Sequence, residues 1–502
     1  MSLRLARILC LSMLCLTPAW DQAAEAAPVP LTILHTNDTH DHLEAFDTRH
    51  GKGLGGIARR ASLIRQVKKE NPATLVLDAG DVFQGTPLFN FFSGEPDFIT
   101  MKQAGYDAMA VGNHDLDNGI QNLLTQSRHL DHPPLAINLY DPKGQRYFPT
   151  HRIFERGGLK IAVVGALGRN AFEAVAAPRR AGITFKDPEP ELKHLVQRLR
   201  SQVDLVVLLT HIGHEEEVSL AKAMPDVDLI VGGHSHTKVE KPVVVKHAKR
   251  DTLVAQAFQW GEFMGRIDLQ VEGGRIVRHE GRLLTVGTEI PEDPTVAATV
   301  AHYAKQIATQ MQEVVGRTAI EFSNSRKREG DTPIGNLVAD AVKEETGAQV
   351  AFMNSGGIRA PLPQGDITRG MVFSMLPFEN TLVTFTCTGV QLQAILDFAA
   401  SRNGKSGSLQ VAGLQYEVDG ERARAVQVEG KALEPGAVYR VATIDYVAQG
   451  NDGADVFRSV SEVVNTGTLV RDAFMRFMKK RAGAVEAPSG GRIRKRTPAT
   501  AS

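Results

Sequence analysis

The chain has 502 residues, which is enough for two or three domains that each bury a core. It carries 57 basic and 57 acidic residues, so its formal net charge is zero, and 42% of its residues are hydrophobic. This balance argues against a nucleic-acid polymer as partner, because no extended basic surface is implied. The sequence identifies no protein partner.

Residues 1–27 are typical of a secretory signal peptide. Arg4 and Arg7 precede an apolar run from Ile8 to Leu16, and residues 24–26 offer a small-x-small cleavage site. The run is too short to remain as a permanent membrane span. We therefore expect a periplasmic or secreted protein, with an uncleaved N-terminal anchor as the alternative.

One cysteine, Cys387, remains if the leader is removed with Cys10 and Cys15. A single cysteine cannot form an internal disulfide. Its alternating neighbours from Leu382 onward predict a strand, and we expect Cys387 to be a small core residue.

Residues 28–290 are predicted to form an α/β domain. Buried strands are expected at residues 31–34, 74–77, 108–111, 160–164, 204–209 and 228–231. Between them, residues 56–69 and 190–200 carry apolar side chains at helical spacing. Alternating strands and helices predict a layered architecture with largely parallel pairing.

A helix over residues 291–316 is predicted to join this domain to a second one. Its apolar stripe includes Val296, Val300 and Ile307, and Gly316 marks its expected end. Residues 317–485 mix helices, such as 333–345, with short strands and form the second, α+β domain. Residues 486–502 are expected to be a flexible basic tail.

Polar residues cluster just after the apolar runs of the first domain. They comprise two carboxylates, an amide and four imidazoles: Asp38, His40, Asp81, Asn113, His211, His234 and His236. The carboxyl ends of parallel strands lie at one edge of a sheet, where ligands gather. Two divalent cations that share a bridging carboxylate need about this many oxygen and nitrogen donors. The pattern therefore predicts a two-metal phosphoester hydrolase.

The motifs themselves resemble the 5′-nucleotidase family of calcineurin-like metallophosphoesterases. The resemblance rests in the first half on residues 35–40, 80–85, 111–117 and 210–214, and on the Gly-His-x-His segment 233–236. It continues in the second half through residues 335–337, 354–359, 376–378 and 450–453. It implies a four-layer α-β-β-α sandwich, followed by a smaller α+β nucleotide-binding domain.

The resemblance also implies how the metals are held. One cation would be bound by Asp38, His40, Asp81 and His236, and the other by Asp81, Asn113, His211 and His234. Manganese, cobalt and zinc are the expected ions, with magnesium as a further candidate. His114 and Asp117 match the family's catalytic pair, in which a carboxylate orients an imidazole near the transferred phosphoryl group. A hydroxide held on the metals would attack phosphorus.

The substrate implied by the resemblance is a nucleoside 5′-monophosphate. Phe378 and Tyr446 match aromatic residues that stack on the base. Contacts to phosphate, base or ribose would come from Arg328, Asn354, Arg359 and Asp452. Core packing is the alternative for each aromatic residue.

Three residues differ from those found most often at these positions in the family. His236 stands where Gln or Asn is usual and adds a nitrogen ligand. Asp115 replaces a Glu and is expected to support the ligands without binding metal. Asp41 replaces a frequent Gly, for which the sequence offers no physical account.

Other activities stay open. The same chemistry could act on UDP-sugars, on nucleoside di- or triphosphates, or on 2′,3′-cyclic nucleotides. More distant alternatives are a sulfate thiohydrolase and a nucleotide-binding protein that has lost its activity.

Overall fold

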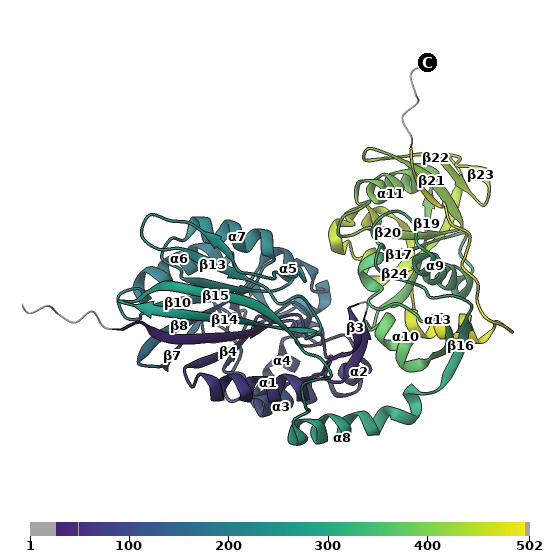
Figure 1. Ribbon diagram of the computed structural model, residues 1–502. Coiled ribbons are helices and arrows are strands. Elements are labelled where there is room, and N and C mark those ends of the chain that lie inside the picture. The colour runs from purple at the N-terminus through teal and green to yellow at the C-terminus, as the bar shows by residue number, and fades with distance from the viewer. Residues whose placement is uncertain (1–26, 49, 497–502) are drawn as a thin grey trace, which may run out of the picture.

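The computed structural model describes residues 27–48 and 50–496 as two lobes joined by one long helix (Figure 1). The expected signal peptide therefore lies, apart from Ala27, outside the described residues. In the part of the chain that the structure describes, no helix combines the length and apolarity needed to cross a bilayer.

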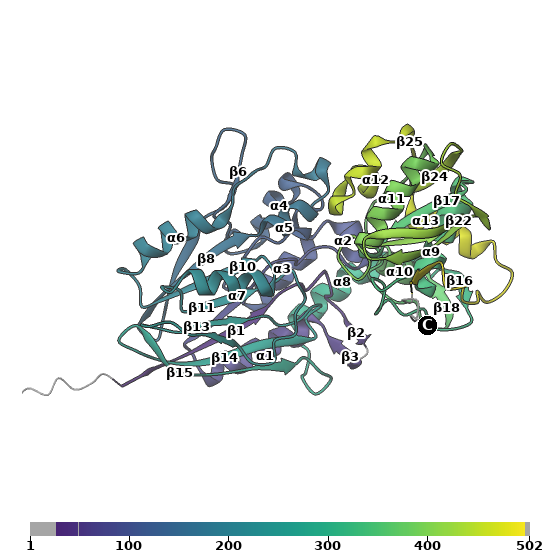
Figure 2. The ribbon, with the colours of Figure 1, turned by 90° about the horizontal axis from the view of Figure 1, so that it is seen from above.

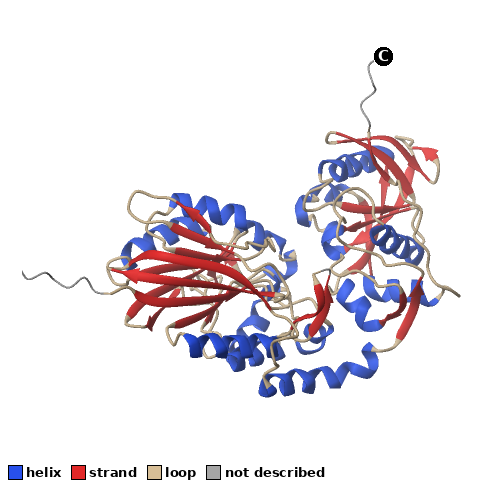
Figure 3. Cartoon of the chain, in the orientation of Figure 1, coloured by secondary structure: helices blue, strands red, loops and turns tan. Residues whose placement is uncertain are grey.

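Two sheets form the centre of the first lobe (Figure 3). The five-stranded sheet has the order β15 (Arg275–Thr285), β14 (Phe263–Glu272), β1 (Val29–Thr36), β4 (Thr74–Asp78), β5 (Ala108–Met109). The six-stranded sheet has the order β12 (Val243–Val245), β13 (Thr252–Ala255), β11 (Leu229–Gly232), β10 (Leu205–His211), β8 (Leu159–Leu167), β7 (His151–Arg156). The predicted strands pair in parallel in both sheets, whereas β14, β15, β7 and β12 add antiparallel edges.

Alternating side chains explain why the two sheets stack. In β1, Ile33 joins the cluster between the sheets, and its neighbour Leu34 joins the cluster under the helices. In β4, Leu75 and Val76 divide in the same way. A strand that is apolar on both faces must be covered on both sides, which gives the layered arrangement.

Helices cover the outer faces of the two sheets. Side chains of α1 (Ile57–Glu70) and α3 (Glu95–Ala104) share a core with the first sheet. Those of α6 (Pro188–Leu199) and α7 (His214–Ala223) share a core with the second. The predicted four-layer α-β-β-α fold is confirmed.

The second lobe is an α+β unit with one large core. Its main sheet has the order β20 (Leu409–Ala412), β17 (Val350–Asn354), β24 (Val438–Ile444), β19 (Thr381–Thr388), β25 (Ser461–Leu469). A second sheet has the order β23 (Lys431–Ala432), β22 (Arg422–Val428), β21 (Leu414–Asp419), β26 (Ile493–Lys495). Helices α9 (Pro333–Thr346), α10 (Arg369–Met375), α11 (Gly389–Ser401) and α13 (Val470–Lys479) pack around the sheets (Figure 2). Cys387 is buried in β19, as predicted.

The linker helix is shorter than the sequence predicts. Helix α8 spans Pro294–Met311, capped by the Asp293 side chain, and it does not reach Gly316. Gly316 instead lies in β16 (Val314–Thr318), which pairs with β18 (Gly365–Thr368). A Cβ at Gly316 would come within 2.8 Å of the Met478 side chain, so glycine here serves close packing and does not end a helix.

The segment expected to be a flexible tail, residues 486–502, contains a short strand, β26 (Ile493–Lys495). Strand β26 pairs in parallel with β21. Both guanidinium nitrogens of Arg492 donate to Asp340 at 2.8 Å, and the amide of Ile493 donates to Asp331. Bidentate pairing and a sheet ladder hold the segment, and residues 497–502 lie outside the described residues.

Candidate metal centre and cleft

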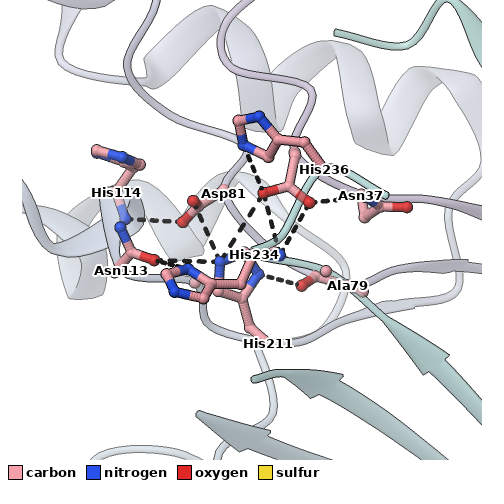
Figure 4. Close-up of polar contacts among 12 residues, drawn as sticks. Asn37, Ala79, Asp81, Asn113, His114, His211, His234 and His236 are labelled. Carbon is pink, nitrogen blue, oxygen red and sulfur yellow. Dashed lines mark hydrogen bonds and ion pairs between the residues drawn. The ribbon is translucent and has the colours of Figure 1, made fainter. Parts of the chain in front are cut away.

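Strand ends of both sheets meet on the side of the first lobe that faces the second lobe (Figure 1), and they bring the seven candidate ligands together. Figure 4 labels five of them, Asp81, Asn113, His211, His234 and His236. Asp38 follows β1, Asp81 follows β4 and Asn113 follows β5 in the first sheet. His211 ends β10, and the 233–236 loop follows β11, in the second. The parallel runs of both sheets thus point their carboxyl ends at one place, as the sequence predicts.

Asp38, His40 and His236 form one group of donors whose ligand atoms lie within 4.8 Å of one another. His236 Nε2 lies 3.2 Å from Asp38 Oδ1 and 3.0 Å from His40 Nε2. The second group consists of Asp81, His211 and His234, whose ligand atoms also lie within 4.8 Å of one another.

Asn113 completes the second group, and Asp81 connects this group to the first. His211 Nε2 lies 3.1 Å from Asp81 Oδ2, and the same carboxylate oxygen is 4.0 Å from His40 Nε2 in the first group. The amide oxygen of Asn113 lies 2.9 Å from His234 Nδ1 and 3.2 Å from His211 Nε2. Asp81 is therefore placed between the groups, where a carboxylate can bridge two cations.

The hydrogen bonds of the imidazoles fit cation binding. His40 Nδ1 lies 3.0 Å from the Gln84 carbonyl oxygen, and His211 Nδ1 lies 2.7 Å from the Ala79 carbonyl oxygen. A carbonyl can only accept, so each Nδ1 carries a proton, and Nε2 is the ring nitrogen left to bind a cation in place of a proton. Two such nitrogens and two buried carboxylates are the donors that divalent transition metals prefer.

The charge of the cluster favours a cation. Burial lowers the pKa of His211, but the Asp81 and Asp38 carboxylates raise it to about 10. Burial and the neighbouring His211 lower the pKa of His234 to about 4. The negative field that attracts a proton to His211 attracts a divalent cation by the same Coulombic force.

The ligand loops store backbone strain. Asp38, His40, Asp81, His234 and His236 all have positive φ, between 48° and 78°. Such a conformation costs about 1–3 kcal/mol at a non-glycine residue and persists only where the surroundings enforce it. It is concentrated here because the loops must turn sharply to aim their side chains inward.

Close packing of the loops explains one glycine of the Gly-Asn-His motif. A Cβ at Gly112 would come within 2.2 Å of the Asp81 amide nitrogen and 2.3 Å of its Oδ1. Any larger residue would therefore displace the carboxylate that lies between the two groups.

A set of polar residues behind the ligands was not identified from the sequence. The Asn37 side chain donates at 2.6 Å both to Asp38 Oδ2 and to the Phe258 carbonyl. Beneath the 233–236 loop, Glu217 accepts from the Gly233 amide at 3.2 Å and from Gln256 at 2.8 Å. Asn37 lies within the motif at residues 35–40, so the sequence offered a signal for it. No motif contains Glu217 or Gln256.

Contacts in the structure explain two residues that differ from those common in the family, Asp115 and Asp41. Asp115 accepts from the amides of Gly112, Val82 and Phe83 at 2.8–3.1 Å, so it supports the Asp81 loop. Asp41 is fully buried and accepts from the Phe89 amide at the start of α2 (Pro87–Phe92) at 2.8 Å. Burial raises the pKa of Asp41 to about 7.

His114 and Asp117 lie beside the cluster. His114 Nδ1 is 2.7 Å from Asp117 Oδ2, and the His114 amide donates to Asp81 Oδ1 at 2.7 Å. Burial alone would lower the pKa of His114, but the Asp117 and Asp81 carboxylates raise it. The geometry is that of an imidazole oriented by a carboxylate that favours its protonated form.

A single cleft of about 3000 Å³ is lined by five of the seven candidate metal ligands and by the residues expected to bind the nucleoside. The second lobe contributes all six of these: Arg328, Asn354, Arg359, Phe378, Tyr446 and Asp452. Arg359 Nη2 reaches to 3.4 Å from His40 Nε2 in the first lobe. The Tyr446 hydroxyl donates to the Ala174 carbonyl of the first lobe at 3.3 Å. The two lobes thus meet over the cluster.

Comparisons with known proteins agree with this architecture. The calcineurin-like phosphoesterase family matches residues 31–238, and the 5′-nucleotidase C-terminal domain family matches residues 314–459. The chain is 30% identical to Protein UshA of Yersinia enterocolitica, over 93% of this chain and 94% of the relative. It is 31% identical to the trifunctional nucleotide phosphoesterase protein YfkN of Bacillus subtilis over 92% of its own length, but it spans only 35% of that relative. The solved 5′-nucleotidase precursor from Thermus thermophilus superposes with a TM-score of 0.86 at 32% identity, covering 93% of this chain and 99% of that one.

Proposed function

This chain belongs to the 5′-nucleotidase family of metallophosphoesterases, which are metal-dependent phosphoester hydrolases, and we propose that it releases phosphate from nucleoside 5′-monophosphates. The observation that carries the proposal is the shared cleft. One wall holds two groups of metal-type donors with His114 beside them, and the other holds the residues expected to bind a nucleoside.

The residues present fit two divalent cations. Asp38, His40 and His236 would hold one cation, Asn113, His211 and His234 the other, and Asp81 would contact both. When bound, the ions lower the pKa of a coordinated water and neutralise charge on the phosphate.

The protein's own side chains supply the remaining chemistry. His114, whose protonated form Asp117 favours, would stabilise charge on the phosphoryl group or donate a proton to the leaving 5′-oxygen. Arg359 reaches the cluster from the second lobe and is placed to hold a phosphate oxygen. Phe378, Tyr446 and Asp452 would hold the base and ribose, since aromatic rings stack on bases and a carboxylate accepts from ribose hydroxyls.

We further propose that the protein works outside the cytoplasm, in the periplasm or as a secreted enzyme. This rests on the composition of residues 1–27, with its basic start, short apolar run and small-residue site. Mass spectrometry of the N-terminus of protein recovered from the periplasm would test it. Recovery of the protein only from the cytoplasmic fraction, with its Met1 leader intact, would overturn it.

The substrate is tested by measuring phosphate release from AMP, UDP-glucose, ATP and 2′,3′-cyclic AMP after chelator treatment and reloading with manganese, cobalt, zinc or magnesium. Metal-restored release from AMP at the highest rate is the expected result. A higher rate on one of the other three would reassign the substrate class within the same chemistry. No release from any of them would overturn the nucleotidase and favour a sulfate thiohydrolase or an inactive nucleotide-binding protein.

A further inference from the structure

A second cavity, of about 610 Å³, lies in the first lobe and shares no lining residue with the catalytic cleft. It lies between β6 (Leu139–Tyr140), which pairs with β9 (Thr184–Phe185), and the residues of α6 that line it. Its apolar part consists of Ile137, Leu195 and the ring of Tyr140, all of which are buried. Its size is that of a small-molecule site.

Three exposed cationic side chains line this cavity, and two of them lie over its aromatic ring. Lys186 Nζ lies 4.1 Å from the centroid of the Tyr140 ring, and Arg146 Cζ lies 5.0 Å from it. Arg198, two turns along α6 from Glu191, supplies the third. Solvent screens the repulsion between exposed charges, but their combined field attracts an anion into the cavity.

The one carboxylate in the cavity lining, Glu191, offsets only the charge of Arg146. Glu191 already accepts hydrogen bonds from the Tyr140 hydroxyl and from Arg146 Nη2. Burial and the adjacent carboxylate raise the pKa of Tyr140 to about 12, so its hydroxyl stays a donor to Glu191. Within residues 27–48 and 50–496, no ion pair joins Lys186 or Arg198 to a carboxylate. The lining therefore carries an excess of positive charge.

We propose that this cavity is a second ligand site that binds a phosphate dianion, away from the catalytic cleft. The phosphate oxygens accept charge-assisted hydrogen bonds from Arg198 and the outer edge of Arg146, and the Lys186 amine lies beside them. An apolar or aromatic part of the ligand, where it has one, lies against Leu195 and Tyr140. The shared chemistry is the phosphate group, whether as free inorganic phosphate or as a phosphate monoester.

Pyridoxal 5′-phosphate is a suitable probe because it combines a phosphate, an aromatic ring and an aldehyde. Its aldehyde condenses with a lysine amine, releasing water, and borohydride reduces the imine to a stable secondary amine that peptide mass mapping locates. With the metal-loaded protein, we expect Lys186 to be labelled about tenfold faster than Lys193, an exposed lysine of α6, since one charge-assisted contact is worth about that much. Pyridoxal, which lacks the phosphate, should show no such preference.

Competing anions and substituted variants distinguish a specific binding site from chance reactivity of Lys186. Inorganic phosphate and phenylphosphonate should each slow the labelling of Lys186. Equal protection identifies free phosphate as the ligand, and stronger protection by phenylphosphonate identifies a phosphate ester. Arg198→Gln should remove most of the preference, whereas Lys193→Gln, which removes the same charge elsewhere on α6, should leave the labelling rate of Lys186 intact. Labelling of Lys186 that neither competitor slows, or that Arg198→Gln leaves unchanged, would overturn the proposal.

Discussion

The imidazole of His114 and the phenyl ring of Phe378 stack across the two lobes, with ring centroids 5.6 Å apart and planes inclined by 27°. The guanidinium of Arg359 lies 5.8 Å from the same phenyl ring. A residue expected to hold the base therefore also covers the residue expected to assist phosphoryl transfer. In this arrangement Phe378 would take part both in holding the base and in positioning His114.

Replacing Phe378 with alanine should lower kcat/KM for AMP. Stacking on a base is worth about 1–3 kcal/mol, so the expected loss is about 10- to 100-fold. Phe378→Tyr keeps an aromatic face and should retain most of the activity. Steady-state kinetics on AMP and on ribose 5-phosphate, which has no base, locate the effect. A loss on AMP alone assigns the ring to the base, and an equal loss on both assigns it to His114. Unchanged kinetics on both substrates would rule out either role.

Replacing His114 with alanine should lower kcat for AMP by about 10²–10⁴-fold, which is the usual contribution of a positioned acid or base. Asp117→Asn should lower it in the same direction, because the amide neither orients nor charges the imidazole in the same way. Bound metal, measured by elemental analysis, should be unchanged in both variants. His214→Ala removes a cleft-lining histidine that belongs to neither donor group and serves as the control. Full activity of His114→Ala would refute the assigned role.

Much of the first lobe could be predicted because its strands are buried on both faces. Such strands read as continuous apolar runs, and polar residues that follow them are conspicuous. The convergence of Asp38, Asp81 and His211 follows from the carboxyl ends of parallel strands alone. The antiparallel edge strands were missed, because β15 is largely exposed and carries no apolar run.

Contacts distant in sequence account for the other differences from the prediction. Gly316 resembles a helix end, but it is a glycine because Met478 packs against it. The segment around Arg492 resembles a basic tail, but Asp340 fixes it. Glu217 and Gln256 support the 233–236 loop from positions that no local pattern marks. The role of each of these residues depends on a contact with a residue distant in the sequence, which no local pattern reveals.

Metal stoichiometry should separate the two donor groups. Asp81 lies between them, so Asp81→Ala should reduce the affinity for both cations. His236 belongs to one group only, so His236→Ala should lose one cation and keep the other. Elemental analysis after dialysis against a weak chelator measures both results, with His214→Ala as the control. Because a cation binds only the folded state, each lost ion should also lower Tm. Loss of both ions from His236→Ala would show that the groups do not bind independently.

The buried Glu217 should make stability depend on pH. Burial raises its pKa in the folded protein to about 8, so the folded state holds a proton that the unfolded chain, with a pKa near 4.5, releases. Its contribution to the free energy of unfolding is therefore fully present below about pH 4.5 and is lost as pH rises through about 8. Glu217→Gln carries no titrating proton, so the fall of Tm between these pH values should be shallower in the variant than in the parent. Thermal unfolding of both proteins with chelator present removes the pH dependence of metal binding from the comparison. Other buried carboxyls, such as Asp78, titrate alike in both proteins and cancel in the difference. Parallel Tm curves would show that Glu217 is already ionised beneath the Gly233 loop.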